Sequence, residues 1–198
     1  KAIRSVLKQT APDLEIIVVD DGSVDSTPRV LAQFGNHISI IRQPNQGRSA
    51  ARNAGVTHAS GDIIAFLDSD DIWLPNKLAE QCSVFAGRPE VGLVQTFSDV
   101  IDENGTQLHE KTRLRQKLYR RALKRGYTYE GMSEECIMFL STVAVRRECW
   151  DRVGPMDTNI PAFEDWDWYL RVALDTEIAT ITETRVHFRQ HAGNTSAQ

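Results

Sequence analysis

Three short apolar runs alternate with helix-like segments in the first half of the chain, and this alternation limits the possible folds more than any other feature. The runs are rich in β-branched side chains and occupy residues 16–19, 38–41 and 63–67. Such runs are typical of strands covered on both faces, as in a parallel sheet. The helix-like segments that follow them lie at about 23–34, 47–59 and 75–86. This order predicts an α/β sheet with right-handed crossovers.

Acidic residues follow directly on two of these predicted strands. Asp20 and Asp21 follow the first strand, and an Asp-Ser-Asp-Asp stretch at 68–71 follows the third. Ligands of open α/β sheets bind beyond the carboxyl ends of the strands. Clustered carboxylates repel one another unless a cation neutralises them, and oxygen ligands suit Mg²⁺ or Mn²⁺. Taken alone, the stretch at 68–71 fits either a metal site or a turn that ends in a helix N-cap.

The second half of the chain is less regular. Strands are predicted at 91–100, 136–145 and 178–187, and an apolar-periodic helix at 168–174. Residues 111–125 contain eight basic side chains and no acidic ones, with apolar residues repeating every four positions. This segment predicts an amphipathic basic helix. Three interpretations fit it: a solvated face, a contact with an acidic or lipid-phosphate acceptor, or attachment to an anionic membrane surface.

Composition narrows the class of protein. A chain of 198 residues with 41% hydrophobic side chains can form one packed domain and is not a disordered segment. Its net charge of -4 gives no sign of a nucleic-acid partner. The three cysteines have no metal-ligand spacing, which favours a reducing compartment. The longest mostly apolar stretch, 136–145, is far shorter than the ~20 residues that span a bilayer.

The order and spacing of several motifs closely resemble the family-2 glycosyltransferases. The motifs are VVDDGS at 18–23, NQGRSAARN at 45–53, FLDSDD at 66–71, RRE at 146–148, VGPMD at 153–157, FEDWDWYLR at 163–171 and FRQHAGNTS at 188–196. The resemblance implies an α/β GT-A fold: a Rossmann-like mixed, mostly parallel sheet flanked by helices in a single domain. It implies a nucleotide-sugar-binding half at about 1–98 and an acceptor-side half at 99–198. It is thinnest at about 99–135.

Family members begin with a hydrophobic strand that lies in the middle of the sheet. Lys1 already lies in what resembles the helix after that strand. We therefore expect the chain to be an N-terminally incomplete catalytic domain in which two strands expose free edges.

The resemblance also implies donor-site roles for particular residues. Asp21 matches the acid that bonds the uracil ring of a UDP donor, and a carboxylate can accept a ring N–H. Arg52 matches a residue that lies along the nucleotide or its phosphates; a structural salt bridge to Asp68 or Asp21 is the alternative. Asp68 and Ser69 belong to the same donor-binding loop.

Metal binding and catalysis are implied for three further positions. Asp70 matches the main ligand of Mn²⁺ or Mg²⁺, with Asp68 in support, and Asp71 is interpreted as the cap of the following helix. His191 matches a histidine that approaches the metal or diphosphate, although an ordinary surface role fits equally. Asp165 matches the base that takes the proton from the acceptor hydroxyl; its alternative is to favour a helix start through the helix dipole.

The implied activity is transfer of a sugar, with inversion, from a nucleotide-sugar donor to an acceptor hydroxyl. We expect a UDP-sugar donor, a glycan or lipid-linked sugar as acceptor, and a cytoplasmic location, with peripheral membrane association if the basic segment binds lipid. A metal-dependent phosphatase is disfavoured because its nucleophilic aspartate belongs after the first strand. A glycoside hydrolase also uses two carboxylates but needs neither Asp21 nor Arg52. A non-catalytic nucleotide- or glycan-binding fragment is the remaining alternative.

Overall fold

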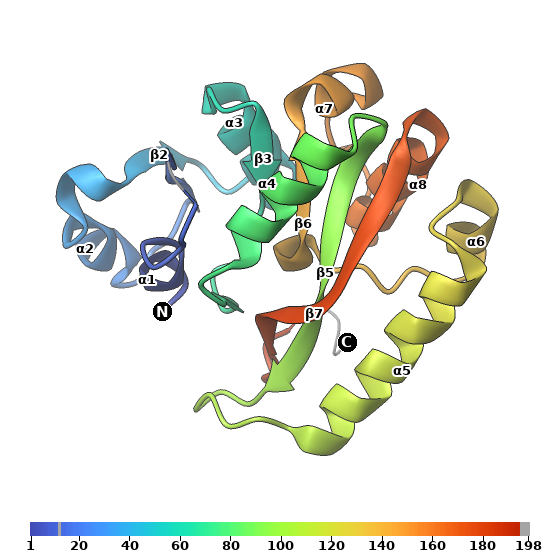
Figure 1. Cartoon of the computed structure of the whole chain (residues 1–198). Helices are drawn as coiled ribbons and strands as arrows, with labels where there is room; N and C mark the ends of the chain where they lie inside the picture. Colours follow the sequence, from blue (N-terminus) through green and yellow to red (C-terminus); the bar gives the residue numbers. More distant parts are fainter. Residues whose placement is uncertain (12, 195–198) are drawn as a thin grey trace.

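The computed structural model describes residues 1–11 and 13–194, and its strands form two sheets (Figure 1). In the smaller sheet, β1 (Ile17–Asp21) pairs in parallel with β2 (Ser39–Gln43). The larger sheet has the order β3-β6-β5-β7-β4. Its strands are β3 (Ile63–Ala65), β4 (Ile72–Trp73), β5 (Val91–Ile101), β6 (Val143–Arg146) and β7 (Glu177–Arg189). Among the described residues, the edge strands β1, β2, β3 and β4 each pair on one side only, and the expected incompleteness of the domain stays a prediction.

Helices flank both sheets (Figure 1). The first half of the chain contains α1 (Ala2–Val6), α2 (Thr27–Ala32), the 3-10 helix η1 (Gly35–His37), α3 (Arg48–His58) and α4 (Lys77–Gly87). The second half contains α5 (His109–Arg125), α6 (Tyr129–Glu134), the 3-10 helix η2 (Leu140–Thr142), α7 (Arg147–Val153) and α8 (Glu164–Asp175). The predicted basic helix is confirmed as α5. Within the described part of the chain, no helix is both long and apolar enough to cross a membrane.

The larger sheet is mixed, as expected, but it departs from the mostly parallel sheet that the resemblance implied. β5 pairs in parallel with β7, whereas β3 with β6, β5 with β6, and β4 with β7 are antiparallel. The difference arises where the chain returns from α5 and α6. β6 enters the sheet between β3 and β5 and runs opposite to both.

The strand predicted at 136–145 is wrong in its first part. The chain enters the 3-10 helix η2 at Leu140 and becomes a strand only at Val143. The Ser141 hydroxyl accepts a hydrogen bond from the backbone N–H of Asp68, and Thr142 bonds back to the Phe139 carbonyl. These local bonds compete with a sheet ladder, as hydroxyl side chains often do. They also place Ser141 beside the acidic loop at 68–71.

An aromatic core fixes the position of α8. Trp168 is fully buried, and its ring centroid lies 5.1 Å from that of Trp150 and 6.3 Å from that of Phe66. Because Phe66 stands two residues before the acidic loop, this packing brings the first turn of α8 toward the same end of the sheet. The apolar periodicity of α8 places its aromatic side chains on the buried face, and this packing holds Asp165 close to the loop.

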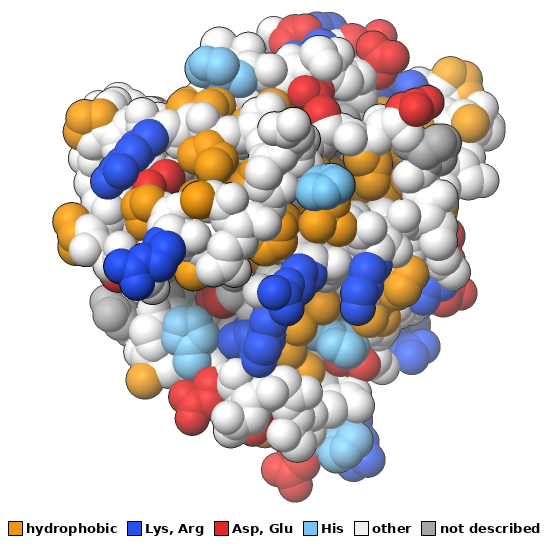
Figure 2. Space-filling model, turned by 90° about the vertical axis from the view of Figure 1, so that its left-hand side faces the viewer, with side chains coloured by type: hydrophobic (Ala, Val, Ile, Leu, Met, Phe, Trp, Pro, Cys, Tyr) orange, Lys and Arg blue, Asp and Glu red, His pale blue; other side chains and the backbone are white. Residues whose placement is uncertain are grey.

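The side of the molecule formed by α1, α2 and β2 exposes apolar surface. Figure 2 views this side, where hydrophobic side chains lie in the open between basic ones. Leu7, Val30 and Ile40 are 44%, 46% and 47% exposed. The larger sheet, by contrast, is covered. Nearly every residue of β5 is buried between the neighbouring strands and the helices.

Candidate active site

Asp21 lies at the end of β1 and organises the loop before α3. One carboxylate oxygen, Oδ1, accepts hydrogen bonds from the Gln46 N–H at 2.9 Å and the Gln43 amide at 2.8 Å. The other, Oδ2, accepts from the Gly47 N–H at 2.9 Å. Gly47 is the N-cap of α3, so Asp21 fixes where this helix begins. The assignment of Asp21 to a nucleotide base stays a prediction.

Arg52 connects three parts of the site. Its guanidinium bonds to Glu164 Oε1 at 2.7 Å and to Asp68 Oδ1 at 3.2 Å. Burial opposes the charge of Arg52, but the carboxylates of Asp68 and Glu164 outweigh burial and raise its pKa. The predicted salt bridge between Arg52 and Asp68 is therefore confirmed. Through it, α3 is tied to the acidic loop and to the start of α8.

Glu164 is a site residue that sequence reasoning missed. It is 2% exposed, and its Oε1 also accepts from Arg48 at 2.7 Å. Its second oxygen, Oε2, is buried without a hydrogen-bond partner among the described residues. A signal was present in the sequence, because Arg48 and Arg52 are four residues apart and so share one face of a helix.

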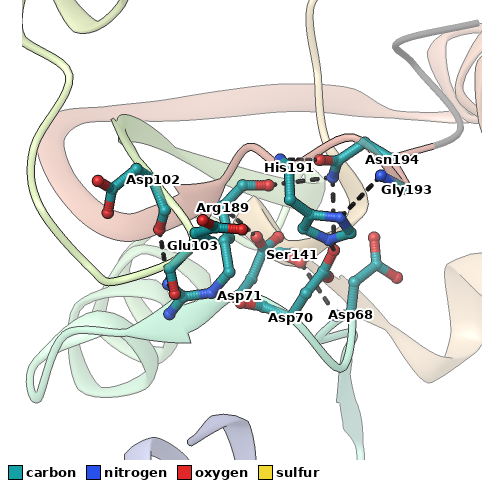
Figure 3. Close-up of polar contacts among 10 residues, drawn as sticks. All are labelled: Asp68, Asp70, Asp71, Asp102, Glu103, Ser141, Arg189, His191, Gly193 and Asn194. Carbon is teal, nitrogen blue, oxygen red and sulfur yellow. Dashed lines mark hydrogen bonds and ion pairs between the residues drawn. The ribbon is translucent and has the colours of Figure 1, made fainter.

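The loop at 68–71 places its side chains in different directions. Asp68 points toward Arg52, and Ser69 is exposed. Asp70 Oδ2 lies 3.0 Å from His191 Nε2 and 3.4 Å from the Asn194 amide nitrogen (Figure 3). The structure thus brings Asp70 and His191 together, while Asp68 pairs with the arginine. Among the described residues, no group of three or more His, Cys, Asp or Glu side chains is arranged to hold a metal ion.

The hydrogen bonds of His191 define which nitrogen carries its proton. The Gly193 N–H donates to His191 Nδ1 at 3.1 Å, so Nδ1 acts as an acceptor. The neutral ring then carries its proton on Nε2 and donates it to Asp70. In this arrangement His191 orients the Asp70 carboxylate.

Asp71 does not cap a helix, and that interpretation is wrong. The next helix, α4, begins six residues later with Asn76 as its N-cap. Asp71 is 1% exposed and accepts the backbone N–H of Arg189 at 2.8 Å. Burial raises the pKa of Asp71 to about 7, against the hydrogen bonds that it receives from Ser141 and Arg189. Its role is to join the acidic loop to the end of β7.

Arg189 completes that connection. Its guanidinium donates to the carbonyls of Asp70, Asp102 and Glu103 at 2.8, 2.7 and 3.0 Å (Figure 3). Neither Arg189 nor Asn194 was predicted as a site residue, although both belong to the motif at 188–196. Thr195 and Ser196 of that motif lie outside the described residues.

Asp165 lies in the first turn of α8, next to Glu164. Burial raises its pKa, and the negative charge of Glu164 raises it further, while Arg52 acts in the opposite direction. The preceding residue, Phe163, has a left-handed backbone with φ 63°, which is uncommon for a side chain of this size. Trp166 anchors the same turn through a bond from its indole N–H to the Met132 carbonyl at 2.8 Å. A carboxylate with this raised pKa, held in one position, can serve as a proton acceptor. Its catalytic role stays a prediction.

Comparison with known sequences identifies one family. Residues 1–146 match the family described as "Glycosyl transferase family 2". An uncharacterized glycosyltransferase of Nostoc sp. is 34% identical, over 98% of this chain and 61% of its own length. The Escherichia coli protein WfgD, named as a UDP-Glc:alpha-D-GlcNAc-diphosphoundecaprenol beta-1,3-glucosyltransferase, is 31% identical over 91% of this chain and 66% of its own length. The chain thus spans about two thirds or less of these relatives.

Solved structures agree with the fold. Staphylococcus aureus TarS in complex with UDP superimposes with a TM-score of 0.73 at 17% identity, over 96% of this chain and 55% of its own. The mannosyltransferase PcManGT of Pyrobaculum calidifontis, in complex with GDP-Man and Mn²⁺, gives 0.73 at 21% identity, over 98% and 53%. The sheet and helices of the chain therefore have the GT-A arrangement that the motifs implied.

Proposed function

Because the chain belongs to glycosyltransferase family 2, we propose that it moves a sugar from a nucleotide-sugar donor to an acceptor hydroxyl with inversion. The observation that carries this proposal is the chain of contacts from Asp68 through Arg52 to Glu164. It joins the donor-side loop to the turn that bears Asp165. The chain covers about three fifths of the length of its Nostoc relative, so this activity is proposed for the protein that contains it.

The donor is proposed to be a UDP-sugar. Asp21 would accept the uracil N–H, exchanging one of its present bonds to the loop at 46–47 for a bond to the base. Arg52 would contact the nucleotide or its diphosphate, and Asp68 with Ser69 would face the ribose. Support comes from UDP in TarS, although GDP-Man in PcManGT leaves the base to be tested.

A divalent cation, Mn²⁺ or Mg²⁺, is proposed to bind at Asp70. Such ions commonly use one or two carboxylates and fill their remaining positions with substrate phosphates. Asp70 fits this pattern: its Oδ2 is held by His191 and Asn194, and its Oδ1 has no partner among the described residues. Asp68 is the second carboxylate within the loop. When bound, the metal would offset negative charge on the departing diphosphate.

Asp165 is proposed to act as the base. It would accept the proton of the acceptor hydroxyl as that oxygen attacks the anomeric carbon from the face opposite the diphosphate. Its raised pKa increases its strength as a proton acceptor, provided that the pH keeps it ionised. Arg52 limits this rise, which favours the ionised form near neutral pH.

The acceptor is proposed to be a glycan or lipid-linked sugar at the cytoplasmic face of a membrane. WfgD, by its name, acts on a diphosphoundecaprenol-linked sugar. In this chain, α5 carries a stripe of exposed basic side chains at Arg113, Lys117, Arg120 and Lys124. None of the four has an ion-pair partner within the described residues, so the stripe is free to contact anionic lipid. A phosphatase or hydrolase is not supported by the family match.

Titration of UDP with and without Mn²⁺ tests the proposal. We expect Asp70→Ala to lose the Mn²⁺-dependent part of UDP binding, because the carboxylate that holds the metal is gone. Asp62→Ala is the matched control, since Asp62 is exposed and makes no side-chain bond within the described chain. Asp165→Asn should bind the donor normally yet lower transfer by about 100- to 10,000-fold. If UDP binds the parent protein equally with and without Mn²⁺, the metal assignment is rejected. Full turnover by Asp165→Asn would reject the assignment of Asp165 as the base.

A further inference from the structure

Arg115 lies on the sheet-facing side of α5 and rests against two aromatic rings. Its guanidinium carbon is 3.9 Å from the ring centroid of Phe139 and 4.1 Å from that of Phe188. The two centroids are 5.0 Å apart, so both rings support the same guanidinium. Its Nη1 donates a hydrogen bond to the Ser98 hydroxyl at 3.3 Å, and the side chain of Tyr119 also interacts with its guanidinium.

Arg115 differs from the other partly buried arginines in its partners. Within the described chain, it contacts neither a carboxylate nor a backbone carbonyl. Carboxylates or carbonyls accept hydrogen bonds from the guanidinium groups of Arg52, Arg146, Arg147, Arg171, Arg185 and Arg189, although Nη2 of Arg189 is buried without a partner among the described residues. None of the nitrogens of Arg115 is among the buried polar atoms without a partner. Its unused N–H groups therefore reach solvent along one edge.

The rings that hold Arg115 come from the segments that build the acidic loop. Phe139 stands two residues before Ser141, whose hydroxyl accepts from Asp68. Phe188 immediately precedes Arg189, whose N–H donates to Asp71. The charge of Asp71 also acts on the Arg115 guanidinium. Arg115 therefore lies on the α5 side of the donor loop, away from Arg52 and the start of α8.

Placing an arginine here has a free-energy cost. Burial lowers the pKa of Arg115, yet a guanidinium stays charged at any physiological pH. A desolvated cation without a carboxylate is costly unless an anion meets it. Its planar edge can make two parallel bonds to a phosphate, and the rings fix its orientation in advance.

We propose that Arg115 binds a phosphate group of the acceptor substrate, beside the acidic loop and separate from the donor diphosphate. This proposal rests on the proposed transferase function. The ligand class is a phosphate ester or diphosphate attached to the acceptor, and a lipid-linked diphosphate and a soluble phosphate compound share that chemistry. The proposal gives α5 two functions: its outer stripe faces the surroundings, and Arg115 faces the substrate.

Calorimetric titration of the whole chain, saturated with UDP and Mn²⁺ so that the donor site is filled, tests the proposal. The probes are inorganic pyrophosphate and octyl diphosphate. Arg115→Gln should weaken binding of the anionic probe by about 10- to 100-fold and leave UDP affinity unchanged. Arg29→Gln is the matched control, because it removes one charge from an exposed arginine on α2, outside the basic stripe of α5. Octyl alcohol, which lacks the anion, should bind to Arg115→Gln with the same affinity as to the parent protein.

The outcomes separate the sources of the phosphate. Tighter binding of octyl diphosphate than of pyrophosphate assigns a lipid-linked source, and equal binding assigns a soluble one. Equal losses in Arg29→Gln and Arg115→Gln would overturn the proposal, because the overall positive charge of the protein would then explain both. A loss of UDP affinity in Arg115→Gln would overturn it too, since Arg115 would then belong to the donor site.

A second measurement does not depend on the folding of the variant. The Nε–H resonance of Arg115 in the parent protein should shift when pyrophosphate is added, and no shift would reject the site. This signal is readable without UDP. Absence of UDP binding, with or without Mn²⁺, would therefore count against the transferase proposal, while the Arg115 resonance would still report on phosphate binding.

Discussion

The carboxylate of Glu164 takes part in most of the charge interactions of the candidate site. It is buried, it holds both Arg48 and Arg52 through a single oxygen, and it directly precedes Asp165. Its negative charge is one reason why the pKa of Asp165 is raised, and its hold on Arg52 keeps the opposing charge nearby. A change at Glu164 therefore acts on both arginines and on Asp165.

We expect Glu164→Gln to move the acidic limb of the pH profile of kcat/KM toward lower pH. In the parent protein this limb should lie above the ordinary 3.8 of an aspartate, because Asp165 must lose its proton to act. Removing the charge of Glu164 removes one cause of that rise. Glu183→Gln, an exposed glutamate on β7, should leave the limb in place. A limb that stays unchanged in Glu164→Gln would argue against Asp165 as the titrating base.

At the scale of elements, the turn after β1 depends on a glycine. Gly22 has φ +80°, and a Cβ added there would lie 2.7 Å from the backbone nitrogen of Asn45. This close approach lets Asp21 reach the N–H groups of Gln46 and Gly47. The β1–β2 pair and the start of α3 are held together at this point.

We expect Gly22→Ala to destabilise the protein by more than Gly35→Ala. Gly35 also has a positive φ, +53°, but a Cβ there meets nothing within 4 Å. The control should lose about 1–2 kcal/mol for the left-handed backbone alone. Gly22→Ala adds a backbone clash and should also weaken UDP binding by displacing Asp21. Urea denaturation and UDP titration measure both effects; equal stability losses would contradict the role of the close approach.

The α5 stripe leads to a prediction about membranes. Replacing Arg113, Lys117, Arg120 and Lys124 with Gln should abolish cosedimentation with vesicles that contain anionic lipid, because each basic residue near such a surface contributes about 1 kcal/mol. Neutral vesicles should bind neither protein, and raised salt should release the parent protein. Undiminished binding of the four-site variant would show that another surface makes the contact.

At the scale of the whole molecule, burial of Asp71 makes stability depend on pH. Its pKa rises from 3.8 to about 7 on folding, so between these values the folded chain binds more protons than the unfolded chain. The contribution of this group to stability is full below pH 4 and is lost as the pH rises through 7. The shift corresponds to a change on the order of 4 kcal/mol across that window.

We therefore expect Asp71→Asn to change the slope of stability against pH. The variant cannot ionise at this position, and its amide oxygen can still accept the Arg189 N–H. Relative to the parent protein, Asp71→Asn should gain stability as the pH rises from 5 to 8. Urea denaturation at several pH values in metal-free buffer measures the difference. Parallel curves for the two proteins would mean that Asp71 does not titrate in this range.

Much of the fold could be predicted, because local patterns determine it. The β-branched runs located β1, β2 and β3, and apolar periodicity located α5 and α8. The segment at 136–142 could not be predicted, since its apolar composition suits a strand while Ser141 and Thr142 bond locally. The directions of the strands could not be predicted from local patterns either, because the position of β6 in the sheet depends on the long connection through α5 and α6.

In the candidate site too, contacts between residues close in sequence could be predicted, whereas contacts between distant residues could not. The salt bridge from Arg52 to Asp68 spans 16 residues and was among the expected alternatives. Glu164 and Arg189 act across 112 and 118 residues, through contacts with Arg52 and Asp71 that no local pattern contains. Asp71 was misassigned for this reason: whether a loop aspartate caps a helix or anchors a strand depends on what packs over it.

The bond between Asp71 and Arg189 also bears on the order of events during synthesis. The acidic loop leaves the ribosome more than a hundred residues before the strand that anchors it, since the two partners are 118 residues apart. Long-range pairing of this kind forms late in folding. A nascent chain therefore holds the acidic loop unanchored until β7 has been made and docked. Nucleotide binding at this loop would then require the finished chain. Only molecules in which β7 has docked into the sheet would bind nucleotide there.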